Sequence, residues 1–147
     1  MKNKFSFRFE SILNLKEKQE DNKKILLGTA TKKLKKEEEN LMSLKSKKNS
    51  IATEWKEKTK EAISIKEVQI QASKMNYIDD VIKQQNKIII SCEEDVTNHR
   101  VQLIEATKQS KIFNRLKEKD TDVYKYQLMK NEESLLDQLV SYRSATK

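Results

Sequence analysis

Cys92 and His99 are the single cysteine and the single histidine of the chain, and they are its best candidates for nucleophilic or metal chemistry. They lie seven residues apart, about two turns of a helix. A metal site usually needs three or four ligands, so this pair falls short. Ser-His-Asp catalysis needs a pocket and a strained turn, and one glycine cannot build a phosphate-binding loop. We therefore expect no enzyme, no cofactor and no metal site, with both side chains filling the interior.

The elements that position these side chains are predicted to be very long helices. The 147 residues include one glycine and no proline, although 37% are charged and the mean hydropathy is −0.88. Turns need breakers, so their scarcity favours few and long helices. High charge also fits disorder, but regular apolar spacing argues against that alternative.

Positions at alternating steps of three and four are mostly apolar, with polar interruptions, from Leu13 to Ile65, where ten of sixteen are apolar, and again from Ile78 to Phe113. This spacing is typical of the contact seam of a coiled coil. Beyond Phe113 the pattern predicts a slip of register, through Leu116 and Val123 and then toward Leu139.

The two seams predict an all-α fold, a long antiparallel two-helix coiled-coil hairpin that forms a single domain over residues 1–147. Helix one is expected over about 6–63, the tip over 64–76 and helix two over 77–143. Asn76 with Asp79, or else Ser73, would cap helix two. A continuous rod that dimerises is the alternative. The hairpin fits better, because two seams of similar length flank one candidate turn.

The net charge of +8 lies entirely in residues 1–75, and most of it comes from lysine. Specific phosphate recognition prefers arginine, so we expect solubility and a weak bias toward acidic partners, and no nucleic-acid partner. No run approaches the roughly 20 apolar residues of a membrane span, and the start lacks the apolar core of a signal peptide. With one cysteine and no internal disulfide, a cytoplasmic location is expected.

Two apolar sets are not required by the seams. The first is Phe5, Phe7 and Phe9, which the expected hairpin would place opposite a group near the end of helix two. That group is Leu135, Leu136, Leu139 and Tyr142. These side chains would plug the end of the hairpin. Because alternating phenylalanines cannot all face one seam, we expect at least one to be exposed for a partner.

The second apolar set is a stripe beside the seam of helix two: Tyr77, Val81, Gln84 and Ile88. Their spacing places them on one helix face. Two interpretations remain open. The stripe packs against Ile65, Val68 and Ile70, or it is a docking face for a partner.

The segment FSFRFESILNLKEKQE, which begins at Phe5, resembles the start of the FliJ family of flagellar protein-export components. The segment IFNRLKEKDTDVYKYQLMKNEESLLDQLVSYR resembles the C-terminal pattern of the same family. The matching residues are Leu116, Lys117, Glu118, Lys119, Tyr124, Glu132, Glu133, Asp137 and Arg143. Gln138 stands where the family usually has an acid.

This resemblance implies a coiled coil similar to the central stalk of rotary ATPases. Its terminal end would enter the ring of the flagellar export ATPase hexamer, promote ring assembly and couple the ring to the membrane export gate. The resemblance also implies recycling of export chaperones, and a place at the inner face of the cell membrane, which it would contact only through partners. The implied ATPase contacts are Phe5, Phe7, Phe9, Lys117, Glu118, Asp137 and Arg143. The implied gate contacts are Tyr77, Val81, Gln84 and Ile88.

Three other hypotheses remain from the sequence. One is the equivalent stalk of a virulence-type type III secretion system. Another is a structural coiled coil that associates with itself through its seams. The third is a binder of anionic surfaces, which would lose affinity steeply with salt.

Overall fold

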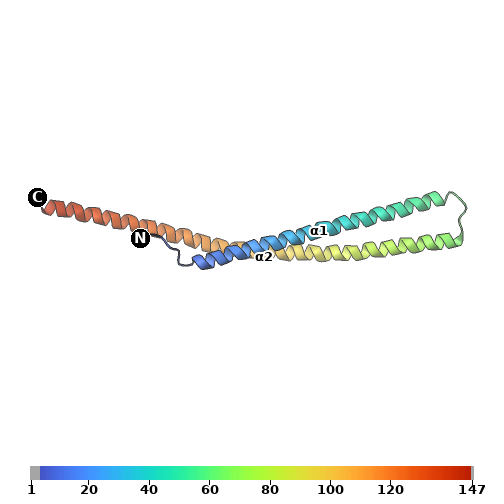
Figure 1. Cartoon of the computed structure of the whole chain (residues 1–147), viewed down its shortest axis with the longest axis horizontal. Coiled ribbons are helices and arrows are strands. Elements are labelled where there is room, and N and C mark those ends of the chain that lie inside the picture. Colours follow the sequence, from blue (N-terminus) through green and yellow to red (C-terminus); the bar gives the residue numbers. More distant parts are fainter. Residues whose placement is uncertain (1–3, 147) are drawn as a thin grey trace. The chain divides into compact units, whose positions relative to one another are not determined.

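The computed structural model describes residues 4–146, and it contains two α-helices and no strand in this range. Helix α1 is Glu10–Lys58 and helix α2 is Ile65–Ala145, joined by a turn at residues 59–64 (Figure 1). The two helices pack against each other as a helical hairpin. The predicted all-α hairpin is therefore confirmed.

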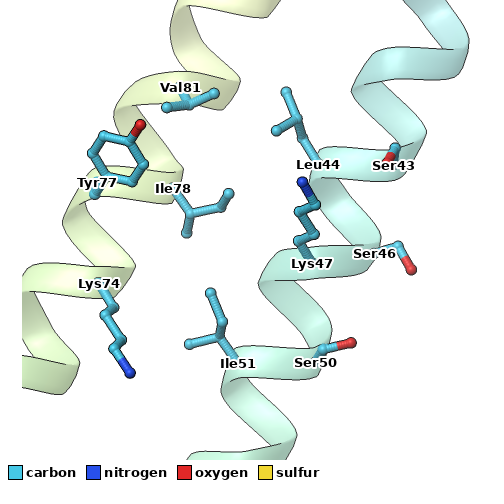
Figure 2. Close-up of a pocket in the computed structure, with 10 residues that line it drawn as sticks. All are labelled: Ser43, Leu44, Ser46, Lys47, Ser50, Ile51, Lys74, Tyr77, Ile78 and Val81. Carbon is cyan, nitrogen blue, oxygen red and sulfur yellow. The ribbon is translucent and has the colours of Figure 1, made fainter.

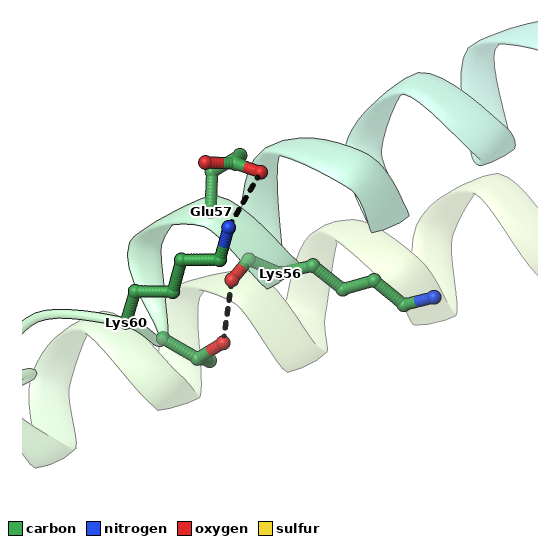
Figure 3. A network of polar contacts seen from close by, with 4 residues as sticks. Lys56, Glu57 and Lys60 are labelled. Carbon is green, nitrogen blue, oxygen red and sulfur yellow. Dashed lines mark hydrogen bonds and ion pairs between the residues drawn. The ribbon is translucent and has the colours of Figure 1, made fainter.

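Helix α1 ends in a turn that has no glycine. Lys56 and Lys58 lie in its last turn, where cations interact favourably with the helix dipole. The Thr59 hydroxyl donates to the Lys56 carbonyl at 2.8 Å, and Lys60 Nζ contacts Glu57 Oε1 at 3.3 Å (Figure 3). The Thr59 hydroxyl and the backbone N–H groups of Lys60 and Glu61, which donate to the Glu57 and Lys58 carbonyls, thus satisfy carbonyls at the helix end that a glycine-containing cap would otherwise serve.

Helix α2 begins earlier than its sequence suggested. The backbone N–H of Glu67 donates to Ser64 Oγ at 3.2 Å, so Ser64 is the N-cap. The expected caps, Asn76 and Ser73, lie inside α2. The tip is therefore residues 59–64 and not 64–76, and helix one ends at Lys58 and not near residue 63. The physical reason is that the S-x-x-E spacing at 64–67 is a capping-box pattern, which starts the helix as soon as it occurs.

Contacts divide the chain into two compact units. The tip unit is Lys23–Leu103, and the terminal unit is the chain up to Asn22 together with the chain from Ile104. In the tip unit, α1 and α2 run antiparallel. Lys48 Nζ lies 2.6 Å from Asp79 Oδ1 and Gln71 Nε2 donates to the Ile51 carbonyl at 3.3 Å.

The seam of the tip unit lies where the apolar spacing predicted it. Ile78, Ile89, Cys92 and Val96 are buried, and all four are predicted seam positions of helix two. On α1 the facing positions are half-buried. A pair of helices shields only one stripe on each partner and leaves the rest of each helix in water.

In the terminal unit the predicted slip of register is followed only in part, because its positions Leu116 and Leu128 are half-buried and its other positions are exposed. Val123 is 55% exposed, whereas Lys117 and Tyr124, four and eleven residues after Phe113, are half-buried and contact the N-terminal segment. The original heptad frame therefore also continues, as far as Tyr124, through polar and aromatic residues. Apolarity alone could not follow a seam of this composition.

Candidate partner-binding sites

The first candidate site is an aromatic cluster in the terminal unit. Phe7 is 6% exposed and meets Phe9 edge to face, with ring centroids 5.8 Å apart. Phe9 meets Phe113 of α2 at 6.3 Å, and Phe5 lies 5.4 Å from the ring of Tyr124. Edge-on aromatic pairs stabilise beyond simple burial. The alternating phenylalanines therefore fasten residues 5–9 onto α2.

An ion pair borders this cluster. Lys117 Nζ lies 3.1 Å from Glu10 Oε1 and 3.0 Å from Glu10 Oε2, with both side chains a little under half exposed. Glu10 is also the first residue of α1, where a negative charge suits the helix dipole. The Arg8 guanidinium lies 4.5 Å from the centroid of the Phe9 ring. Charge and aromatic packing together fix where α1 starts against α2.

The phenylalanines do not lie opposite the leucines near the end of α2, so that expectation is wrong. Because the turn lies at 59–64, Phe5 reaches only Tyr124. Asp137 lies thirteen residues farther along α2, about 20 Å at 1.5 Å per residue. Of the predicted ATPase contacts, the phenylalanines and Lys117 come together, with Glu118 beside Lys117 on α2. Asp137 and Arg143 lie well beyond them.

The last three turns of α2 carry large apolar side chains in water. Their exposed fractions range from 58% to 69%. They are Leu135, Leu136, Leu139, Val140 and Tyr142. Helix α1 begins at Glu10, whose contact on α2 is Lys117, so these side chains lie past its start. A solvated helix end does not need so many apolar groups, and a contiguous exposed set marks a contact surface.

The second candidate site is a groove in the tip unit, with a volume of about 650 Å³. Leu44 and Ile51 of α1 and Ile78 and Val81 of α2 point toward one another across it, with Tyr77 at its edge (Figure 2). The remaining lining residues are polar: Ser43, Ser46, Lys47, Ser50 and Lys74. The contribution of α1 was not predicted, since the sequence gives no pairing of α1 with α2 until the turn is known.

The predicted stripe beside this groove is largely in solvent. Tyr77 is 71% exposed and Ile88 44% exposed, Gln84 is exposed, and Val81 is half-buried in the groove. The suggested packing partners in the sequence are themselves 45–79% exposed: Ile65, Val68 and Ile70. All three belong to α2 itself, so they cannot cover Tyr77 as a facing helix would.

Cys92 is buried, and His99 Nδ1 is a buried atom with no hydrogen-bond partner. Among residues 4–146, no three His, Cys, Asp or Glu side chains are grouped so that they could hold a metal ion. Over the same residues, neither helix has an apolar stretch long enough to cross a membrane.

Comparison with known proteins gives one match. The model of the family described as "Flagellar FliJ protein" matches residues 5–147, nearly the whole chain. No curated protein and no solved structure matches. The match includes both segments that carried the resemblance in the sequence. The chain therefore belongs to the FliJ family, whose members are non-catalytic proteins of flagellar protein export, a type III secretion process.

Proposed function

We propose that this protein is the stalk of the flagellar export ATPase, and that its terminal unit enters the axial hole of the ATPase hexamer and promotes ring assembly. The observation that carries this proposal is the exposed apolar end of α2, past the start of α1. A ring lumen would cover this apolar face together with the charged side chains around the same part of the helix. Membership of a flagellar export family supplies the class of partner.

The aromatic cluster has a supporting role in this proposal. Phe7 is buried and Phe5 and Phe9 are half-buried, so they hold the start of α1 against α2 and offer little surface to the ring. Polar contacts with the ring come instead from exposed charged side chains of α2, which are Glu118, Asp137 and Arg143. The half-buried Lys117, next to Glu118, is the fourth proposed polar contact. This divides the predicted ATPase residues into supports and contacts.

The tip unit would engage the membrane export gate through the groove and the stripe beside it. The groove is lined by apolar side chains of both helices, and Lys47 and Lys74 are among its polar lining residues (Figure 2). An amphipathic helix or an extended segment with flanking acids fits this chemistry. Tyr77, Val81, Gln84 and Ile88 are the proposed contacts. Export chaperones are further proposed partners, and the membrane is reached only through the gate.

Titration of the cognate export ATPase with this protein tests the ring proposal. Hydrolysis of ATP should rise with wild-type protein and rise much less with the charge reversals Glu118→Lys and Asp137→Lys. Both side chains are exposed, so circular dichroism should report unchanged helicity. A triple variant with Phe5→Ala, Phe7→Ala and Phe9→Ala should also fail to stimulate the ATPase. Unlike the charge reversals, it should have a lower unfolding temperature than the wild type. Absence of stimulation by the wild type at every ratio would remove the stalk function.

A second pair of variants separates the two partners. Tyr77→Asp and Ile88→Asp lie in the tip unit and should leave the ATPase response intact. They should weaken binding to purified export-gate protein at least about tenfold, since a charge would enter an apolar contact. Asp137→Lys should weaken the ATPase response and leave binding to the export-gate protein intact. If both classes of variant fail with both partners, the assignment of one unit to each partner is wrong.

A further inference from the structure

One face of the exposed end of α2 has charges at its centre. At 3.6 residues per turn, Glu132, Leu139 and Arg143 lie within about 40° of one another around the helix. Leu135 lies on one side of this line and Leu136 and Val140 lie on the other, all at least 60% exposed, and Leu139 on the line itself is 58% exposed. A glutamate and an arginine thus occupy the middle of an apolar stripe, where an ordinary amphipathic helix has no charge.

Glu132 and Arg143 cannot satisfy each other within one helix. They are eleven residues apart, which places them about 16 Å from each other along the axis. An antiparallel helix with the same sequence brings them together, because Glu132 of one copy then faces Arg143 of the other. The two-fold symmetry forms this ion pair twice, once at each end of the contact.

We propose that this face of α2 binds the same face of a second copy of this chain, in an antiparallel isologous pair. The register that joins Glu132 to Arg143 of the second copy also places Leu135 against Val140. In the same register Leu136 faces Leu139 of the second copy. Four apolar layers therefore lie between two ion pairs, and this agreement of charge and apolar spacing selects the second copy as the occupant.

The charge of the segment permits such pairing. The whole chain carries +8, but residues 125–145 contain three basic and three acidic side chains. The basic ones are Lys125, Lys130 and Arg143, and the acidic ones are Glu132, Glu133 and Asp137. Two copies of this segment approach without net repulsion, whereas two copies of the lysine-rich α1 would repel each other. The contact is small, so the dimer has a dissociation constant on the order of micromolar.

The inference stands on the pattern of this face and does not depend on the ATPase proposal. If both hold, the dimer covers Arg143 and the leucines that the ring would use. The dimer is then a form of the protein that cannot enter the ring, and dilution or ring binding releases it.

Sedimentation equilibrium of the full chain, up to about 200 μM, tests the pairing well above the expected dissociation constant. Wild type should show a concentration-dependent dimer. Glu132→Arg alone places arginine against arginine, and Arg143→Glu alone places glutamate against glutamate. Each should weaken the dimer at least about tenfold. An equimolar mixture of the two variants should dimerise again, because both ion pairs re-form with their signs exchanged.

Ser134→Arg is the control, since Ser134 lies on the opposite side of α2 and should leave the dimer unchanged. Circular dichroism at the same concentrations verifies that each variant remains helical. A wild type that is monomeric throughout the range overturns the proposal. So does a mixture that stays monomeric, or a dimer that both single variants retain, because each shows that this face is not the contact.

Discussion

The side-chain amide of Gln85 joins the two helices by donating hydrogen bonds to two groups of Glu37, the side-chain carboxylate and the backbone carbonyl. Its Nε2 atom lies 2.6 Å from Glu37 Oε2 and 2.9 Å from the Glu37 backbone carbonyl. Gln85 is only 9% exposed and occupies a seam position that an apolar residue would usually fill. A polar group in a seam restricts the helices to registers that satisfy it. This pair therefore fixes how α1 and α2 align in the tip unit.

Replacing Gln85 by alanine should lower the free energy of unfolding by about 1–2 kcal/mol, the typical effect of losing a hydrogen bond to a charged group with some packing. Gln84→Ala is the matched control, because Gln84 is its exposed neighbour. Urea unfolding followed by circular dichroism measures both. Equal losses in the two variants would show that the amide of Gln85 has no special role.

The same contact predicts a dependence of stability on pH. The hydrogen bond from Gln85, aided by one from Asn40 and by the charges of Lys33 and Lys36, holds the pKa of the Glu37 carboxyl below its ordinary value of 4.5. A lowered pKa in the folded state means that the stabilisation is present above pH 4.5 and is lost as the pH falls through the folded-state pKa. The unfolding temperature of the wild type should therefore drop on acidification below pH 4.5.

Other carboxylates also titrate in this range, so the comparison of variants isolates Glu37. Glu37→Gln removes the titrating group, and Gln85→Ala removes the main cause of its lowered pKa. Both variants should lose less stability than the wild type between pH 6 and pH 3. Identical pH profiles for all three proteins would contradict this assignment.

The heptad spacing predicted the interior well, because burial along a two-helix contact repeats with the helix period. Ile78, Ile89, Cys92 and Val96 were all found in this way. The turn was predicted too late, because Asn76 and Ser73 also resemble N-caps, whereas the residue that caps α2 is Ser64. Because of that error, the phenylalanines were predicted to lie opposite the wrong part of α2. Their real neighbours, Phe113 and Tyr124, depend on turn position and cannot be found from local sequence alone.

The position of the turn can be tested by insertion. A Gly-Ser pair placed between Ala62 and Ile63 only lengthens the connection, and doubling a loop costs about 0.6 kcal/mol. The same pair between Met75 and Asn76 enters α2, adds a helix-interior glycine at about 1 kcal/mol and displaces Gln71 from its bond to Ile51. Thermal unfolding should show a small loss for the first insertion and a much larger loss for the second.

A single cooperative transition is expected in that same thermal experiment. The chain was predicted to be one domain, although its contacts gather in a terminal and a tip unit. Both helices pass continuously from one unit into the other, so partial unfolding would have to break α1 and α2 at once. Two resolved transitions, with only one of them shifted by Gln85→Ala, would show that the units unfold separately.

The ion pair of Lys117 with Glu10 permits a test that separates structure from binding. Both side chains are a little under half exposed, so Lys117→Glu should cost no more than about 1 kcal/mol of stability. Adding Glu10→Lys restores the attraction with exchanged signs, and the unfolding temperature should recover in part, because a lysine at the start of α1 is disfavoured by the helix dipole. If Lys117 contributes to ATPase stimulation only by fixing the start of α1, the double variant should stimulate like wild type. If its positive charge contacts the ring, as proposed above, stability should return and stimulation should not. Recovery of both would reassign Lys117 from contact to support, leaving the exposed charges farther along α2 as the ring-binding groups.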